Sequence, residues 1–456
     1  MLLPSWINRS ASRLAAPERY RWLETIAKQT GWGPEEIRAY QDRKVAELIR
    51  YCWQYVPFYQ RHWRDAIRSP DDVQTVAQLE RLPVLSKDLW RANFDEVTTI
   101  DPSIKSEIGR TGGSTGRPTV YRTTRYDQEL SWGQMYLGWM WAGYRPGDPF
   151  LVVGGESVGV GLGDKRNRRD RVMNRWITSG SNLTPQRARE LASLSVFGRF
   201  RFIYGYPNAI RELGELLSDI GARMPMLRGV VCTAEVMRPE VRADISAAFG
   251  GVPVHDQWGM NDGGLLATEG PDRDGLHVFF HRSVLEVVDS ENRQIETLQV
   301  PGRALATSIA NLASPFVRYE TGDEVHWRSF QPSPSGIHWP RIGPVDGRTG
   351  DVIYLPSGRR IAMPGLTLVM RWLEGLRQYQ FIQTSQDAVT VRLDVDDGFK
   401  NSDADVISYL NRRIADEIKW TVVRGTPERT QNGKVLIIRN DWRRGLAYNS
   451  ASSPTA

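Results

Sequence analysis

The chain has 456 residues, enough for about three average domains or for one large and one small domain. Apolar residues make up 40% of it and charged residues 25%, as in ordinary globular proteins. The net charge of +6 comes without a dominant Lys/Arg tract, which argues against nucleic acid as a partner. Cys52 and Cys232 are too few for a disulfide framework and favour a cytoplasmic location. No apolar run approaches the length of a membrane span.

Residues 1–100 are predicted to be mainly helical. Between Glu36 and Arg50, apolar side chains recur at the spacing of one helix face. Aromatic residues such as Trp53 and Tyr59 follow, and we expect them to pack this part against the rest of the chain, because aromatic stripes are usually core.

A glycine-rich segment covers residues 110–118. It contains three glycines, three hydroxyl side chains and two arginines. Glycines let backbone N–H groups approach a polyphosphate closely, and hydroxyls and arginines can bind its oxygens. The same composition is also typical of an exposed surface loop, and no Walker A pattern runs through it. The candidate phosphate-binding residues are Thr111, Gly113, Ser114, Thr115, Gly116 and Arg117.

Strands and helices are predicted to alternate over residues 199–259. The strands cover 201–205, 227–232 and 252–257, and Pro207 and Pro239 begin the intervening helices. This alternation predicts an open, largely parallel α/β sheet. Ligands bind beyond the carboxyl ends of such strands, so the residues at these ends are candidates for one site. They are Tyr206, Ala234, Glu235, Gln257, Trp258, Gly259, Met260, Asn261 and Asp262.

The chain beyond about residue 351 is predicted to be a small α+β unit. Residues 388–395 alternate like a strand, Ser402 can cap a helix together with Asp405, and 419–424 and 435–439 are further strands. Residues 449–456 are predicted to form a disordered tail.

Several segments resemble one known superfamily. Thr111–Pro118 is similar to the Ser-Ser-Gly-Thr-Thr-Gly-Lys-Pro phosphate loop of the adenylate-forming enzymes, which include acyl-CoA synthetases, adenylation domains and luciferases. Tyr51–Tyr59 and Leu82–Lys87 resemble the phenylacetate-CoA ligase branch and its CapK-type relatives. Arg117 replaces the usual Lys of the loop and keeps its positive charge.

The resemblance implies roles for the residues at the strand ends. Trp258 stands for the family's aromatic residue near the adenine, and Asp262 stands for its magnesium-binding Glu with a side chain one methylene shorter. Asn261 replaces a hydroxyl residue of the same motif. Ala234 and Glu235 would border the adenine. Tyr206, together with Trp258, would lie at the acyl-binding pocket.

Three later motifs continue the resemblance. Arg318–Asp323 is similar to Arg-Tyr-Arg-Thr-Gly-Asp, with Glu320 for the middle Arg, and the Asp323 carboxylate would accept hydrogen bonds from both ribose hydroxyls. Gly347–Asp351 resembles the hinge motif, in which Arg348 would contact the nucleotide and Gly350 replaces an Asp. Arg429–Lys434 resembles the loop that ends in the catalytic lysine, although Asn-Gly alone predicts a hairpin turn with Lys434 in solvent.

The family fold implies a large α/β domain over 1–349, with open, mostly parallel sheets and helices, and a small mobile C-terminal α+β lid over 350–448. The implied activity uses ATP and Mg²⁺ to convert a carboxylic acid to an acyl-adenylate, releases pyrophosphate, and transfers the acyl group to an acceptor, by the closest resemblance coenzyme A. One alternative is an amide ligase that acylates an amino sugar or amino acid. Another is a non-catalytic nucleotide- or carbohydrate-binding relative. The sixteen Trp and sixteen Tyr residues would suit carbohydrate binding, and Asp262 and Gly350 in place of Glu and Asp are compatible with a weakened active site. A homodimer is compatible with the chain.

Overall fold

The computed structural model describes residues 5–110, 119–155, 168–180, 183–198, 200–345, 352–357, 360–362, 366, 370, 373–428 and 435–442. The chain forms two compact units, Met1–Val345 and Asp346–Ala456. The boundary expected between residues 349 and 350 lies a few residues beyond this division. No helix of the described residues has the length and apolar character needed to cross a membrane.

Helices dominate the first part of unit 1. Pro17, Pro34 and Pro57 occupy first-turn positions of three helices, where the missing N–H costs no intrahelical hydrogen bond. Ser86 caps a fourth by accepting a hydrogen bond from the Leu89 N–H. The helices are α1 (Ser5–Ala15), α2 (Pro17–Lys28), α3 (Pro34–Tyr55), α4 (Pro57–His62) and α5 (Lys87–Ala92), with 3₁₀ turns at Pro70–Asp72 and Ala77–Arg81.

A mixed sheet of nine strands lies at the centre of unit 1 in the described part of the chain. Its strand order is β13-β14-β9-β8-β7-β6-β5-β3-β4. Strands β4, β3, β5, β6 and β7 are mutually parallel, whereas the pairs from β7 to β13 are antiparallel. The strands are β3 (Phe150–Gly154), β4 (Arg175–Ser179), β5 (Phe202–Gly205), β6 (Gly229–Thr233), β7 (Val254–Gly259), β8 (Leu266–Glu269), β9 (Leu276–Val278), β13 (Trp327–Ser329) and β14 (Arg341–Ile342).

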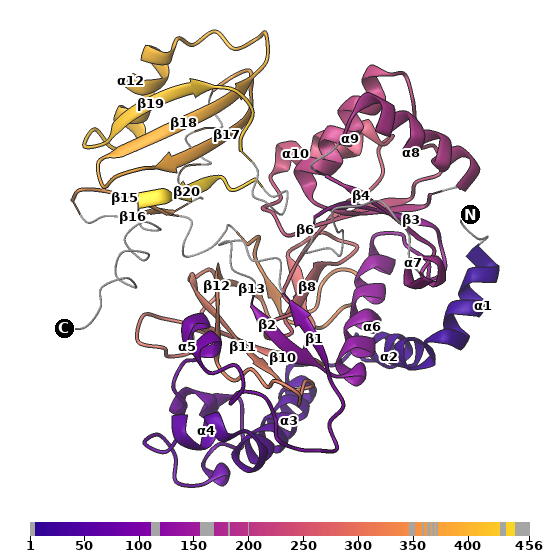
Figure 1. Cartoon of the computed structure of the whole chain (residues 1–456), viewed down its shortest axis with the longest axis vertical. Coiled ribbons are helices and arrows are strands. Elements are labelled where there is room, and N and C mark those ends of the chain that lie inside the picture. Colours follow the sequence, from indigo (N-terminus) through magenta and orange to yellow (C-terminus); the bar gives the residue numbers. More distant parts are fainter. Residues whose placement is uncertain are drawn as a thin grey trace. The chain divides into compact units, whose positions relative to one another are not determined.

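The predicted alternation of strands and helices is confirmed in the parallel half. Helix α9 (Pro207–Asp219) connects β5 to β6, and α10 (Pro239–Ala248) connects β6 to β7. Both helices begin at the predicted prolines. Helices α8 (Pro185–Gly198), α9 and α10 lie together on one face of these strands, while α6 (Arg125–Trp141), backed by α2, lies on the other (Figure 1). The short helix α7 (Arg168–Val172) precedes β4.

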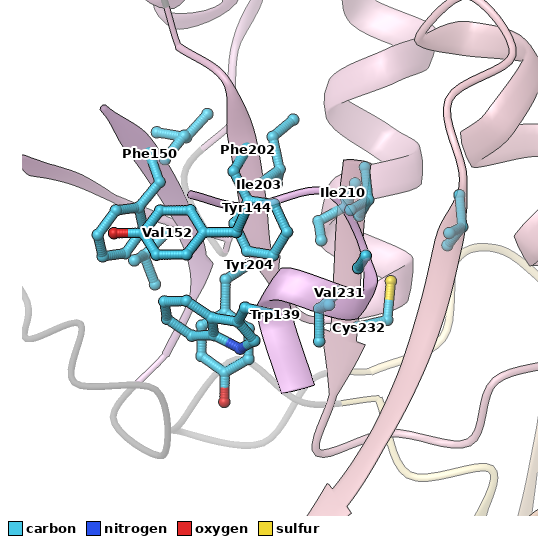
Figure 2. Packing of buried hydrophobic residues seen from close by; sticks show 14 of the residues in the cluster. Trp139, Tyr144, Phe150, Val152, Phe202, Ile203, Tyr204, Ile210, Val231 and Cys232 are labelled. Atoms are coloured by element: carbon cyan, nitrogen blue, oxygen red, sulfur yellow. The ribbon is translucent and has the colours of Figure 1, made fainter. Parts of the chain in front are cut away.

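Aromatic side chains of α6 form much of the core beneath the parallel strands. Trp139 packs against Phe150, Phe202 and Tyr204, with ring centroids 5.3, 5.3 and 4.7 Å away (Figure 2). Gly138 lies so close to β8 that an added Cβ would be 3.0 Å from the Thr268 hydroxyl. Helix α6 is therefore a buried helix whose large side chains fix it against the sheet.

Two smaller β structures complete unit 1. Strands β10 (Ser283–Val288), β11 (Gly302–Ser308) and β12 (Tyr319–Val325) form an antiparallel sheet. Strands β1 (Glu107–Arg110) and β2 (Val120–Thr123) form a hairpin in which Arg110 pairs with Val120. The hairpin thus holds Arg110 and Val120, on either side of residues 111–118, next to each other.

Unit 2 contains a four-stranded sheet of order β19-β18-β17-β20. Ser402 and Asp405 form the predicted capping box of α12. The last strand begins later than predicted, at Ile438 instead of Val435. The elements are β15 (Val352–Tyr354), β16 (Arg360–Ala362), β17 (Leu376–Gln383), β18 (Ala388–Val395), α12 (Asp403–Arg413), β19 (Lys419–Arg424) and β20 (Ile438–Asn440).

Candidate active site

The carboxyl ends of β5, β6 and β7 lie at one edge of the sheet, because these strands are adjacent and parallel. Tyr206 follows β5, Ala234 follows β6 and Met260 follows β7. Ala234 is exposed and has a backbone φ of +69°, which L side chains rarely adopt. Strained backbone of this kind clusters at binding sites, so Ala234 fits the predicted position beside a ligand.

Tyr206 directly precedes α9, and Glu235, in the segment after β6, contacts the first turn of that helix. The Glu235 carboxylate accepts hydrogen bonds from the Asn208 backbone N–H at 3.3 Å and from its side-chain amide at 2.9 Å. This contact satisfies a free N–H group of the first helical turn. Tyr206 is the residue before the helix, and its side chain is fully buried. The predicted adenine role of Glu235 and acyl role of Tyr206 stay predictions.

Gln257 lies beneath the sheet edge, on the side of α6. Its amide oxygen accepts a hydrogen bond from the Trp139 indole at 3.2 Å, and its amide N–H donates to the Tyr204 hydroxyl at 3.2 Å. Burial raises the pKa of Tyr204, which keeps its hydroxyl protonated. Gln257 therefore connects β7 to the core. Its contact with a nucleotide stays a prediction.

A tight turn follows β7 and contains the predicted motif. The Met260 N–H donates to the Leu265 carbonyl at 3.0 Å, and Asn261 is exposed at the tip. Gly259 ends the strand, where an added Cβ would lie 2.7 Å from the Leu265 carbonyl oxygen. Gly263 has a φ of +92°, and a Cβ there would lie 2.6 Å from the Cβ of Ala306. Gly259 thus allows the turn to be tight, and Gly263 allows it to pack against β11.

Trp258 and Asp323, the residues predicted for base and ribose, are in direct contact. The Trp258 indole N–H donates to Asp323 Oδ2 at 3.0 Å, and both side chains are buried. The Asp323 backbone N–H in turn donates to the Thr321 hydroxyl at 3.1 Å. The Asp323 carboxylate is thus held in place by an element of the other sheet.

A second hydrogen bond joins the turn after β7 to the Arg318–Asp323 motif. The Tyr319 hydroxyl donates to Asp262 Oδ2 at 2.9 Å, and both residues are buried. The Tyr319 hydroxyl also hydrogen-bonds Thr119, the first described residue after the glycine-rich segment. Burial, followed by the charge of Asp262, raises the pKa of Tyr319, so the phenol stays a proton donor. In the sequence, the only signal for Tyr319 is its place inside the Arg318–Asp323 motif, and this place alone indicates no role.

The segment that carries Asp323 is also supported by residues around the start of α5. The Leu85 N–H donates to the Arg318 carbonyl at 3.0 Å, and the Lys87 ammonium donates to the Thr321 carbonyl at 2.6 Å. Arg318 has a φ of +49° and pairs with buried Glu286 at 3.1 Å. Burial raises the pKa of Glu286 to about 7 and Arg318 opposes that rise. The segment Leu82–Lys87, which resembles the family in sequence, therefore supports the site through its hydrogen bonds.

A buried ion pair lies next to strand β2 of the hairpin. Arg282 binds both carboxylate oxygens of Asp127, at 2.6 and 2.8 Å, and Thr123 of β2 donates to the same carboxylate at 2.9 Å. Gly264 lies against Arg282, where an added Cβ would be 3.3 Å from its side chain. This ion pair connects α6, β2 and the turn after β7.

The described residues offer one carboxylate, Asp262, for the expected Mg²⁺. No group of three or more His, Cys, Asp or Glu side chains in the described ranges is arranged to hold a metal ion. Mg²⁺ usually keeps several waters and binds one or two carboxylates together with substrate phosphates. A single oriented carboxylate near the end of the glycine-rich segment fits that mode of binding.

The remaining predicted site residues lie outside the described residues. They are Thr111, Gly113, Ser114, Thr115, Gly116, Arg117, Arg348 and Lys434. Their roles stay predictions from the motifs.

Comparisons with known proteins agree with the motifs. No protein-family model matches the chain. Protein CapK of Staphylococcus aureus is 23% identical over 376 residues, which is 81% of this chain and 81% of CapK. A phenylacetate-coenzyme A ligase of Thermus thermophilus is 25% identical over 344 residues, 73% of this chain and 74% of that protein.

The fold is that of an acyl-CoA ligase. The crystal structure of 2-hydroxyisobutyryl-CoA ligase in the postadenylation state, in complex with R3-HIB-AMP, matches with a TM-score of 0.72 and 18% identity, covering 93% of this chain and 94% of that one. The same ligase with 2-HIB-AMP and CoA in the thioesterification state matches over the same shares with a TM-score of 0.57 and 19% identity. These findings confirm the resemblance to the adenylate-forming superfamily and its phenylacetate-CoA ligase and CapK branch.

Proposed function

We propose that this chain, related to the phenylacetate-CoA ligases and CapK within the adenylate-forming superfamily, activates a carboxylic acid with ATP. A carboxylate oxygen of the acid forms a bond to the α-phosphorus, and the bond from that phosphorus to the bridging oxygen of pyrophosphate breaks. The products are an acyl-adenylate and pyrophosphate. The observation that supports this proposal is the pair of hydrogen bonds, Trp258 to Asp323 and Tyr319 to Asp262, which joins the two motifs expected to hold nucleotide and metal.

Catalysis of such a step is mostly positioning and neutralisation of charge. Asp323 would accept hydrogen bonds from the ribose hydroxyls, and the Trp258 ring would lie near the base. Mg²⁺ bound with ATP would neutralise phosphate charge, and Asp262 would hold it. The 111–118 loop would bind the departing pyrophosphate, and Arg348 and Lys434 would contact the nucleotide and the reacting oxygens. No side chain has to become a covalent nucleophile.

The second half-reaction transfers the acyl group to an acceptor. With coenzyme A, the thiol sulfur bonds to the acyl carbon, the bond from that carbon to the AMP oxygen breaks, and the thiol proton leaves. The products are a thioester and AMP. An amine is the second candidate acceptor, as the resemblance to CapK-type relatives and amide ligases implies. A cytoplasmic location and a homodimer stay predictions.

Exchange of labelled pyrophosphate into ATP tests the first half-reaction. We expect exchange that depends on one class of acid when aryl and aliphatic acids are compared. Coenzyme A or amines, added with the best acid, then identify the acceptor by product formation. A protein that binds ATP but gives no exchange with any acid would instead be the non-catalytic relative.

A further inference from the structure

Tyr319 is held in the site by contacts of both its ring and its backbone. Its ring packs edge-on against Phe316 at 4.7 Å and Trp90 at 6.2 Å, and the ring itself is fully buried. Its backbone is bridged to Leu85, whose carbonyl accepts the Glu320 N–H at 2.9 Å. Side chains packed in this way hold a functional group within a narrow range of positions.

The turn after β7 brings Asp262 to this fixed hydroxyl. Gly263, the next residue, has a left-handed backbone, and an added Cβ would lie 2.6 Å from Ala306 and 3.6 Å from the Tyr319 ring. Ala306 is the residue that pairs with Tyr319 in the β11–β12 ladder. The contact at 2.9 Å between Tyr319 and Asp262 therefore depends on a glycine that permits close approach.

The same hydroxyl connects the carboxylate to Thr119. Thr119 is buried, hydrogen-bonds Tyr319 and directly follows residue 118. Carboxylates that bind metal ions are commonly oriented by hydrogen bonds from a second layer of residues. An Asp in place of the family's Glu reaches less far, so its orientation matters more.

We infer that Tyr319 is a positioning residue that orients the Asp262 carboxylate toward Mg²⁺·ATP and ties it to Thr119. This inference rests on the proposed function, since it assigns Asp262 to the metal. Tyr319 itself does not touch the metal or the reacting atoms.

The test measures metal binding without turnover. Mn²⁺ binding to the protein in the presence of a non-hydrolysable ATP analogue is followed by electron paramagnetic resonance. Tyr319→Phe keeps the ring and removes the hydroxyl, and we expect the Mn²⁺ dissociation constant to rise about 10- to 100-fold. The matched control is Tyr59→Phe, which removes another buried hydroxyl, bonded to the Pro315 carbonyl at 2.6 Å, and should leave Mn²⁺ affinity unchanged.

A double-mutant cycle shows whether Tyr319 acts through Asp262. In an Asp262→Asn background, Tyr319→Phe should change Mn²⁺ affinity by less than about twofold. If Tyr319→Phe does not fold, Thr119→Val decides, with weaker Mn²⁺ binding supporting the inference. Unchanged affinity in a folded Tyr319→Phe protein, or equal losses in both backgrounds, would overturn it. Absence of Mn²⁺–nucleotide binding in the wild type would instead reject the proposed function.

Discussion

Trp258 donates its indole N–H to the Asp323 carboxylate at 3.0 Å, although the two residues belong to different sheets. This hydrogen bond holds one carboxylate oxygen of Asp323 in place. The second oxygen is bonded to the same carbon, so its range of positions is restricted as well. A carboxylate oriented before the ligand binds loses less freedom on binding ribose. This preorganisation leads to the first prediction.

Asp323→Asn should raise the KM for ATP about 10- to 100-fold, because it removes charge-assisted hydrogen bonds worth about 1.5–3 kcal/mol. Trp258→Phe keeps a ring near the base and should raise the same KM by a smaller factor. Both are measured as the ATP dependence of pyrophosphate exchange. Glu324→Gln is the control, since Glu324 follows Asp323 on β12 but is exposed on the opposite side. An ATP KM that stays at the wild-type value in Asp323→Asn would remove Asp323 from the nucleotide site.

Asp262→Asn should raise the Mg²⁺ concentration needed for half-maximal exchange and slow the reaction. The amide keeps the shape of the side chain but loses the negative charge that Mg²⁺ binds. Asp262→Glu keeps the charge and should have a milder effect. The measurement is exchange rate against Mg²⁺ at saturating ATP. An unaltered Mg²⁺ requirement in the Asn variant would exclude Asp262 as a metal ligand.

Much of the parallel half of unit 1 could be predicted from sequence, because local signals determine it. Pro207 and Pro239 begin helices, and apolar strands precede them. The antiparallel half carries weaker signals, since β9 and β14 have only three and two residues. The contacts of Asp262 with Tyr319 and of Trp258 with Asp323 join residues 57 and 65 positions apart. They depend on how two sheets pack, which periodicity and turn residues do not encode.

A pH prediction concerns Asp256 on β7, opposite Cys232 of β6. Burial, followed by the charge of Glu269, raises the pKa of Asp256 to about 7, while Arg242 opposes the rise. A carboxyl group with a raised pKa stabilises the fold fully below its unfolded pKa, near 4, and this contribution is lost as pH rises toward 7. Asp256→Asn should therefore be more stable than wild type at pH 8, by on the order of 4 kcal/mol, since each of about three pKa units corresponds to 1.36 kcal/mol.

Urea unfolding of both proteins between pH 4 and pH 8 checks this expectation. The difference in unfolding free energy should grow with pH and level off above pH 7. A constant difference over the whole range would show that Asp256 ionises in the fold as it does in the unfolded chain.

Lys434→Ala should separate the two half-reactions. A lysine that is needed while negative charge develops at the α-phosphate contributes to adenylation, and its loss should cost about 10²-fold or more. In a lid that rotates between steps, the same lysine is not needed for transfer from a supplied acyl-adenylate. Rates of exchange and of product formation from synthetic acyl-adenylate are compared in the folded variant. Equal losses in both would assign Lys434 a structural role.

Formation of an acyl-adenylate by this chain is tested most directly by isotope transfer. The acid that supports exchange is labelled with oxygen-18 in its carboxylate and turned over with ATP and the acceptor, and the nucleotide products are analysed by mass spectrometry. Attack of the carboxylate on the α-phosphorus predicts AMP that carries one labelled oxygen, together with unlabelled pyrophosphate. ADP with the label in inorganic phosphate would show attack on the γ-phosphorus and would contradict the account.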